Sequence, residues 1–205
     1  MFVYREIYTI ATPRQPDFEP RVTGLHARLG QESTSRGTLL LKFMGNASRY
    51  QAFRFWDSRE AAQAWGRHPD MQAYLASRPP ANYLAPPQID YWEDDASYGP
   101  GGDAGFVVQE DGLLAGGKLP DFEALNRDLA ETCASAPGFV GRRVYRFLGA
   151  PGRFLTVALW ASQENYQSAT WGEGVGSFLE SRPSAELLSV PPDQQFFQVL
   201  DKRQS

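Results

Sequence analysis

The amino-acid sequence predicts an α+β protein built from two tandem βαββαβ units. When the sequence is shifted by 104 positions it superposes on itself without a gap, Phe2–Pro79 onto Phe106–Pro183. Each copy contains two kinds of stretch that follow one another along the chain. In one kind apolar residues alternate, which is typical of strands, and in the other an apolar residue recurs every three or four positions, which is typical of helices. A self-similarity of this length indicates that one structural unit was duplicated and fused.

The repeat also predicts the domain organisation. We expect a first unit over residues 1–95, a linker over 96–104 and a second unit over 105–205. The sequence around the boundary, residues 93–105, is first acidic and then rich in Gly and Pro, without apolar periodicity. Identical pairs are spread along both copies: Phe2/Phe106, Asp17/Asp121, Leu25/Leu129, Trp56/Trp160, Ser58/Ser162 and Arg78/Arg182.

The elements of the first copy follow from its pattern. Asp17 is expected to cap a helix, because its carboxylate can accept hydrogen bonds from the first turn, and Pro69 is expected to break the second helix in two. In chain order we expect the strand Phe2–Ile10, a helix from Asp17 to Gly30, the strands Thr38–Met44 and Tyr50–Trp56, a helix Ser58–Ser77 and the strand Gln88–Glu93.

The second copy predicts the same order. Its helix is expected to be capped by Asp121, and Cys133 falls on the apolar stripe of that helix, where it is expected to be a small core residue. In chain order we expect the strand Gly105–Glu110, that helix, the strands Arg142–Leu148 and Phe154–Trp160, a helix Ser162–Ser181 and the strand Gln194–Leu200. This βαββαβ order is the ferredoxin-like pattern.

The third strand of each copy predicts how the sheets are covered. Both of its faces carry apolar bulk, whereas a sheet with one face in water would show a polar residue at every second position. Helices can cover only one face. The other face is therefore expected to meet a partner sheet, and the second copy is the obvious candidate.

Composition excludes several classes of function. The formal net charge of −4 argues against nucleic-acid binding, which calls for a basic face. No apolar run approaches the roughly 20 residues of a membrane helix, and no secretory signal precedes the first strand, so a soluble, cytoplasmic protein is expected. Two histidines are too few for a multi-His metal site, and nucleotide, CxxC and HExxH motifs are absent. No metal or cofactor is expected.

Two strand-to-helix segments carry a family resemblance. Residues 55–62, FWDSREAA, and 159–166, LWASQENY, each end a strand in Trp and continue through a Ser/Asp cap into an acidic first turn. The chain resembles the antibiotic biosynthesis monooxygenase (ABM) family of the dimeric α/β-barrel superfamily. The resemblance implies that the two ferredoxin-like units form an intramolecular dimeric α/β-barrel, and that each unit has a ligand cavity between its sheet and its helices.

The resemblance also implies site residues, chiefly in the second copy. Trp160 and Tyr166 match the family's Trp and Tyr, Thr156 stands where the family has Asn, and Arg182 lies two residues beyond the position of the family's Arg. Trp171 would add a flat apolar wall for a polycyclic substrate. The first copy keeps only Trp56 of this set, so the second copy is the expected active one.

The first copy has a different polar set. Arg54 faces inward on a strand and needs an anionic partner, either a substrate phenolate or an internal carboxylate such as Glu6 or Glu93. Arg78 is interpreted as a helix C-terminal cap. The residues expected to contact substrate in this copy are Trp56, Arg54, His68, Trp65 and Tyr74, and His26 joins them as a polar candidate.

These expectations lead to three functional hypotheses. The first is a cofactor-free monooxygenase that converts a polycyclic or polyketide-type phenol or anthrone to a quinone, with O2 as co-substrate. The second is a polyketide cyclase or isomerase on the same scaffold, which would use His68 or His26 as its acid or base. The third is a non-catalytic ligand-binding accessory protein. In each case a small aromatic molecule is the expected partner, and the chain is expected to be a monomer that acts as a pseudo-dimer.

Overall fold

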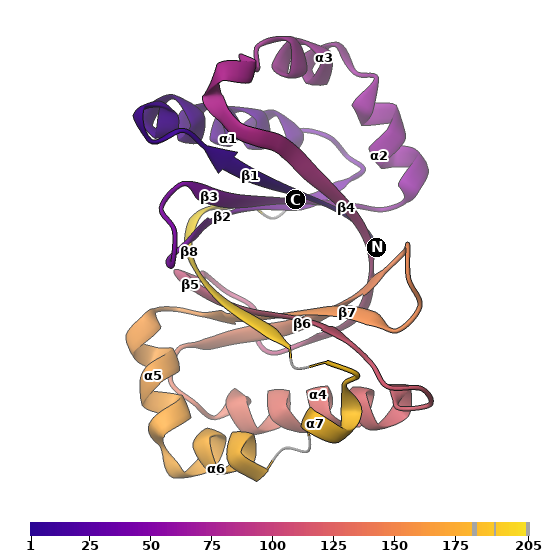
Figure 1. Ribbon diagram of the computed structural model, residues 1–205, viewed down its shortest axis with the longest axis vertical. Coiled ribbons are helices and arrows are strands. Elements are labelled where there is room, and N and C mark those ends of the chain that lie inside the picture. Colours follow the sequence, from indigo (N-terminus) through magenta and orange to yellow (C-terminus); the bar gives the residue numbers. More distant parts are fainter. Residues whose placement is uncertain (182–183, 191, 204–205) are drawn as a thin grey trace. The chain divides into compact units, whose positions relative to one another are not determined.

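The structure is a computed structural model that describes residues 1–181, 184–190 and 192–203 (Figure 1). The chain divides into two compact units. Unit 1 comprises Met1–Glu93 together with Gln198–Ser205, and unit 2 comprises Asp94–Phe197. Each unit is an antiparallel sheet with helices on one face, as the apolar periodicities predict.

Unit 1 contains the expected βαββαβ order. The expected second helix is divided by a short break into two helices, α2 and α3. The second of these begins at Pro69, as the proline predicts. The elements are β1 (Phe2–Ile10), a 3-10 turn η1 (Thr12–Arg14), α1 (Gln15–Leu29), β2 (Ser35–Phe43), β3 (Arg49–Trp56), α2 (Arg59–Gly66), α3 (Pro69–Ala76), a 3-10 turn η2 (Pro80–Asn82) and β4 (Tyr83–Tyr98).

Unit 2 repeats that order with the same break. Here Gly172 separates the two pieces of the second helix, a break that the sequence analysis did not anticipate because it holds no proline. The elements are β5 (Phe106–Leu113), α4 (Leu119–Ala134), β6 (Phe139–Phe147), β7 (Arg153–Trp160), α5 (Gln163–Trp171), α6 (Glu173–Ser181), α7 (Ser184–Leu187) and β8 (Asp193–Arg203).

The central strand pairs are in register between the two copies. In unit 1 the strand order is β4-β1-β3-β2, with Val3 opposite Phe55. In unit 2 it is β8-β5-β7-β6, with Val107 opposite Leu159. Because Val3 and Val107 are equivalent in the repeat, and so are Phe55 and Leu159, the duplicated sequence gives a duplicated sheet.

Two strands, β4 and β8, each begin in one unit and end in the other. β4 belongs to unit 1 as far as Glu93 and to unit 2 from Asp94, and β8 passes from unit 2 to unit 1 after Phe197. The strands therefore follow one another in the closed order β1-β3-β2-β8-β5-β7-β6-β4. The fold class is the predicted one, two tandem ferredoxin-like units with the strand order of a dimeric α/β-barrel.

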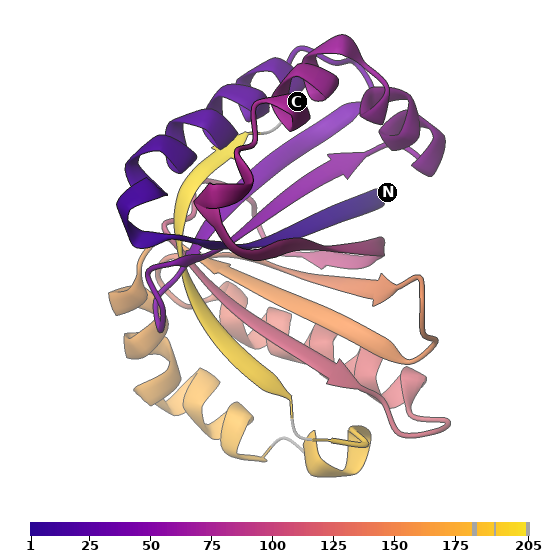
Figure 2. The same cartoon turned by 45° about the horizontal axis from the view of Figure 1, so that its top comes forward.

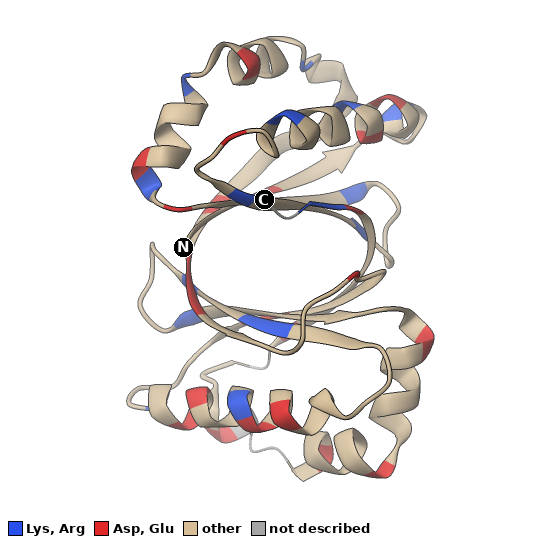
Figure 3. Ribbon diagram, turned by 180° about the vertical axis from the view of Figure 1, so that it is seen from behind, with Lys and Arg blue, Asp and Glu red and all other residues tan. Residues whose placement is uncertain are grey.

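The helices cover one face of each sheet and supply its core. In unit 1, Phe18, Val22 and Leu25 of α1 pack with Tyr50 and Trp56 of β3. Figure 2 shows α1 lying along the sheet of unit 1, and Figure 3 shows the charged residues along α1 and α4. Every residue of β3 from Tyr50 to Trp56 is buried, on both faces, as the apolar pattern predicts.

Two local expectations are corrected and one is confirmed. Asp17 and Asp121 do not cap their helices: α1 and α4 begin at Gln15 and Leu119, because Pro16 and Pro120 start each first turn, and the two aspartates lie inside it. The expected linker, residues 96–104, is strand as far as Tyr98. Cys133 is buried, as expected, and burial raises the pKa of its thiol to about 11.

No helix among the described residues is long and apolar enough to cross a membrane.

Candidate functional site

A pocket in unit 2 lies between the sheet and the helices α4 and α7. Its free volume is about 430 Å³ when the space open to solvent is included, and its interior is narrow. Its lining combines polar residues, Glu110, Asn126, Arg142 and Thr156, with apolar residues, chiefly Phe122, Phe154 and Leu187.

The carboxylate of Glu110 is the centre of the polar lining. The hydroxyl of Thr156 donates a hydrogen bond to Glu110 Oε2 at 3.3 Å, and Gln194 Nε2 donates to Oε1 at 3.2 Å. The guanidinium of Arg142 also faces this carboxylate, and the distance from Arg142 Nη2 to Glu110 Oε2 is 3.5 Å. The side chains of Glu110 and Arg142 are 13% and 8% exposed, so this ion pair is largely shielded from bulk water.

Asn126 of α4 holds Arg142 in place. Its side-chain oxygen accepts a hydrogen bond of 2.8 Å from Arg142 Nε, while its side-chain nitrogen donates to the backbone oxygen of Phe122 at 2.8 Å. Asn126 is 1% exposed. Helix α4 therefore fixes the orientation of the arginine that faces the carboxylate.

Unit 1 has a glutamate at the equivalent position, with different partners. Glu6 Oε2 accepts hydrogen bonds from Arg54 Nη1 at 2.9 Å and from the hydroxyl of Tyr8 at 2.6 Å. Glu6 Oε1 accepts from Arg78 Nη1 at 2.6 Å. The Glu6 side chain is completely buried. We call Glu6, Tyr8, Arg54, Tyr74 and Arg78 the unit 1 cluster.

The charges of the unit 1 cluster set its protonation. Burial alone would raise the pKa of Glu6, but the charge of Arg54 and the charge and hydrogen bond of Arg78 hold this pKa below its usual value. Burial, with the nearby Glu6 carboxylate, raises the pKa of Tyr8 well above its usual value. Glu6 is therefore ionised and Tyr8 is neutral.

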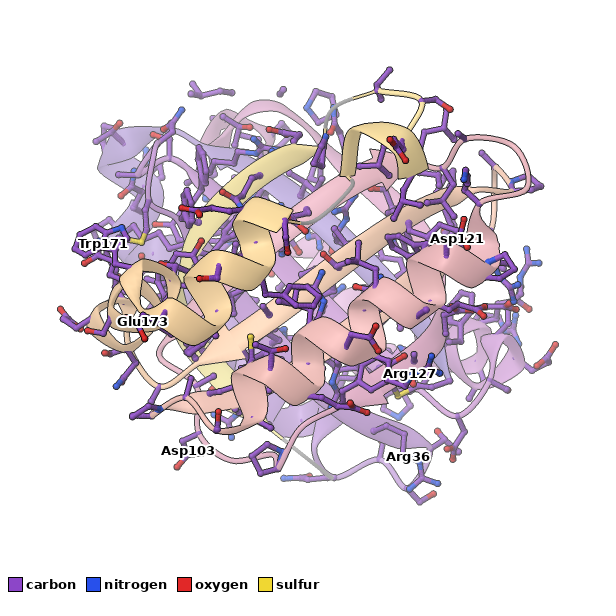
Figure 4. All side chains as sticks on the ribbon, turned by 90° about the horizontal axis from the view of Figure 1, so that it is seen from below. Arg36, Asp103, Asp121, Arg127, Trp171 and Glu173 are labelled. Atoms are coloured by element: carbon purple, nitrogen blue, oxygen red, sulfur yellow. The ribbon has the colours of Figure 1, made fainter. Side chains whose placement is uncertain are left out.

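The residues that the sequence singled out in unit 2 lie in separate places. Thr156 lines the pocket. Trp160 is 2% exposed and packs against Phe139 and Tyr166, with ring centroids 5.2 and 5.8 Å away. Trp171 is 82% exposed and points away from the ribbon (Figure 4), so the structure does not bring it to a pocket. Arg182 lies outside the described residues.

The aromatic residues singled out in unit 1 form a row of ring contacts. Trp56 packs against Trp65 with centroids 6.2 Å apart, and His68 stacks on Trp65 at 4.4 Å. The ring nitrogen of His68 accepts a hydrogen bond from the backbone of Asp70 at 3.3 Å, which makes His68 the cap of α3.

The structure identifies the partners of three polar residues of unit 1 that the sequence left open or assigned differently. Of the two internal carboxylates considered for Arg54, it is Glu6 that pairs with it. Arg78 does not cap its helix, because its guanidinium reaches Glu6. His26 is fully buried with its Nδ1 3.2 Å from Asp201 Oδ2, and burial lowers its pKa to about 4, so its ring is neutral at pH 7.

Sequence reasoning missed the residues that organise the polar lining of the unit 2 pocket. Glu110, Asn126 and Arg142 come from β5, α4 and β6, and only the fold brings them together. One signal was present: the shift of 104 positions pairs Glu6 with Glu110, a charged residue repeated at an inward-facing strand position. Within the described part of the chain, no group of three His, Cys, Asp or Glu side chains is arranged to hold a metal ion.

Comparisons with solved structures agree on the fold. A candidate monooxygenase of Fusobacterium nucleatum superposes with a TM-score of 0.83 at 8% identity, covering 100% of this chain and 94% of that one. An anthrone oxidase-like protein gives 0.64 at 11% identity, covering 99% and 92%. The heme-degrading enzyme of Listeria monocytogenes gives 0.57 at 13% identity, covering 97% and 99%. At these identities the likeness shows the fold alone.

Comparisons of the sequence give one match, to a family model. No curated protein matches the chain. Residues 114–179 match the model of the family described as "Antibiotic biosynthesis monooxygenase". This range runs from the end of β5 through α6 and includes three of the polar residues of the pocket, Asn126, Arg142 and Thr156. The second unit therefore contains a region, residues 114–179, that matches the antibiotic biosynthesis monooxygenase family, and the first unit has the same fold.

Proposed function

We propose that this protein is a cofactor-independent monooxygenase that oxidises a polycyclic phenol or anthrone to a quinone with O2 in the pocket of unit 2. The observation that carries the proposal is a largely shielded carboxylate, Glu110, in a pocket that is also lined by the apolar residues Phe122, Phe154 and Leu187. An apolar ring system with one acidic C–H or O–H group complements such a lining. The likeness to an anthrone oxidase-like protein supports the same class of substrate.

The reaction asks for proton transfer and for stabilisation of an anion. Glu110 takes a proton from the substrate, and Arg142 offsets the negative charge of the carbanion or phenolate. The anion passes one electron to O2, and the two radicals combine to form a C–O bond and a peroxide. Loss of the second proton from the same carbon, with cleavage of the O–O bond, gives the quinone carbonyl and water. The atoms of O2 are divided between these two products.

The strand β7 offers a place for the ring system. Thr156, Ala158 and Trp160 point to the same face of the strand, because side chains alternate along it. The small Ala158 separates the polar group from the aromatic cluster of Trp160 and Tyr166. We therefore propose that the substrate lies along β7, with its acidic group near Glu110 and Thr156 and its rings toward Trp160 and Tyr166.

The test is the replacement Glu110→Gln, assayed with an anthrone in an oxygen-electrode cell while quinone absorbance is followed. We expect the wild type to consume oxygen in step with quinone formation and without effect of a chelator. Loss of the general base should lower the rate by about 100-fold or more. Glu123→Gln, an exposed change on α4 outside the pocket, is the matched control and should leave the rate unchanged.

Three results would contradict the proposal. Oxygen uptake no faster than the spontaneous rate would exclude oxygenase activity on this substrate class. Conversion of the substrate without oxygen uptake would favour a cyclase. Equal rates for Glu110→Gln and wild type would exclude Glu110 as the base.

A further inference from the structure

The unit 1 cluster contains more positive than negative charge. It combines two guanidinium groups, Arg54 and Arg78, with one carboxylate, Glu6, whose two oxygens already accept three hydrogen bonds. The nearby Asp201 does not restore the balance, because it is paired with Arg203 at 3.2 Å and with neutral His26. Aromatic rings offset part of the excess: Arg54 lies over Tyr4 at 5.3 Å and Arg78 over Tyr74 at 4.6 Å.

The cluster also has buried donors without acceptors. The hydroxyl of Tyr74 and the Nε atoms of Arg54 and Arg78 are buried and have no hydrogen-bond partner among the described residues. Tyr74 is 6% exposed and Arg54 2%. Buried donors left unpaired are costly, and a charge in excess adds to that cost. A water molecule could satisfy a donor, but only an anion would also cancel the charge.

Unit 2 shows that the fold does not need three members of this cluster. In the repeat, Tyr8, Arg54 and Tyr74 correspond to Gly112, Ala158 and Phe178, whereas Glu6 and Arg78 are kept as Glu110 and Arg182. Unit 2 forms the same sheet and helix order without them. Buried ion pairs often add little stability compared with apolar residues. The cluster is therefore best explained by a ligand.

A groove in unit 1 shares Tyr74 with the cluster. It lies between α1 and α3, has a free volume of about 680 Å³ when the space open to solvent is included, and is lined by Tyr74 and Leu25 together with Arg21 and Arg28. Arg78 follows two residues after α3, and its side chain is 12% exposed. In the equivalent groove of unit 2, between α4 and α6, acidic side chains outnumber basic ones: Asp121, Asp128 and Glu186 line it together with Lys118, which pairs with Asp121 at 3.2 Å.

We propose that unit 1 binds a small aromatic monoanion, of the carboxylate or phenolate class, with its charged oxygen held by Arg54, Arg78 and Tyr74 and its ring in the α1–α3 groove. The anion supplies the acceptor that the three donors lack. The basic side chains of the groove attract it, whereas the acidic groove of unit 2 repels it. This site is separate from the proposed oxygenase pocket, and its test does not depend on catalysis.

The experiment is a calorimetric titration of the full chain with benzoate, and with neutral benzamide as the uncharged probe. We expect one benzoate per chain and no binding of benzamide at about 10 mM. The replacements Arg78→Gln and Tyr74→Phe should each weaken benzoate binding at least tenfold. Arg36→Gln is the matched control, because Arg36 is an exposed arginine of unit 1 that pairs with Asp57, and it should bind benzoate like the wild type.

Tyr74→Phe keeps the test decisive if the arginine variants fold poorly, because it removes only an unpaired hydroxyl. We expect this variant to lose affinity for benzoate while its melting temperature without ligand stays the same or rises. The proposal is overturned if benzoate does not bind the wild type, if benzamide binds as well as benzoate, or if Tyr74→Phe binds benzoate normally and melts at a lower temperature. The last result would mean that water already satisfies the hydroxyl.

Discussion

Glu6 and Glu110 occupy the same position of the repeat and have acquired different surroundings. Glu6 is completely buried and contacts two arginines and a tyrosine, whereas Glu110 lines a pocket and pairs with Arg142. A carboxylate with both oxygens engaged by buried cations is poorly suited to accept a proton, since its ionised form is strongly favoured. The two residues therefore illustrate how neighbours, rather than residue type, decide chemical role.

His26 leads to a prediction about pH and stability. Burial lowers its pKa to about 4 in the folded protein, from about 6.5 in the unfolded chain. Between pH 6.5 and pH 4 the unfolded chain binds a proton at His26 that the folded protein does not bind. The contribution of His26 to stability is therefore present above pH 6.5 and is lost as the pH falls toward 4. We expect a loss of about 3 kcal/mol over this range. Asp201, the partner of His26, acts in the same direction. Burial would raise the pKa of Asp201, but its interactions with His26 and Arg203 together outweigh burial and the pKa is lowered.

The measurement is chemical unfolding followed by circular dichroism between pH 7.5 and 4.5. His68→Gln, the same change at the partly exposed second histidine of the chain, is the matched control. A His26→Gln protein should lose much of the dependence that the wild type shows. An identical slope in the two proteins would exclude His26 as its source.

At the scale of elements, the repeated serine caps allow a paired prediction. Ser58 accepts a hydrogen bond from the backbone nitrogen of Ala61, and Ser162 from that of Asn165, both at 3.2 Å. We expect Ser58→Ala and Ser162→Ala each to lower the free energy of unfolding by about 1 kcal/mol. Ser168→Ala, an exposed change inside α5, should cost nothing, since alanine favours helix. A loss for Ser168→Ala as large as for the caps would contradict this explanation.

Most elements could be predicted from the sequence because local pattern determines them. The strand Phe2–Ile10 and the break at Pro69 follow from alternation and from proline geometry, and both are confirmed. The continuation of β4 to Tyr98 could not be predicted, because its sequence begins with two aspartates, which have little strand preference, and the strand is held by pairing with other strands. The contact of Arg78 with Glu6 also depends on tertiary packing, and for this reason the interpretation of Arg78 as a helix cap was wrong.

The candidate sites were predictable only where one strand carries them. Arg54 was found because strand alternation points it inward, and Thr156 because it stands where the family that the chain resembles has Asn. Asn126 and Arg142 were not, since their hydrogen bond joins α4 to β6 and depends on how that helix packs on the sheet. A chemical site assembled from several elements has no periodicity of its own.

At the scale of the whole molecule, fusion allows the two units to diverge in function. If unit 2 is the oxygenase, Trp160→Phe should reduce the rate of quinone formation much more than Trp56→Phe, although both tryptophans are 2% exposed and end equivalent strands. Melting temperatures of both variants serve as the control for structural damage, which should be similar. Equal losses of activity would contradict the asymmetry.

Fusion also bears on assembly. We propose that the chain is a monomer, because its two copies already supply the strands that separate subunits contribute in a dimeric α/β-barrel. Light scattering during size-exclusion chromatography should give the mass of one chain at every concentration tested. A stable mass of two chains would contradict this.

The exchange of β4 and β8 between the units has a consequence for how the chain matures during synthesis. Residues 198–203 of β8 belong to unit 1, where Leu200 packs on its core and Asp201 meets His26. The ribosome makes them only after all of the second copy. The first copy therefore emerges without its final strand segment, and its edge at β2 must wait uncovered while the second copy is translated. Order of translation and order of completion are thus reversed: the half that is made first is the half that is finished last.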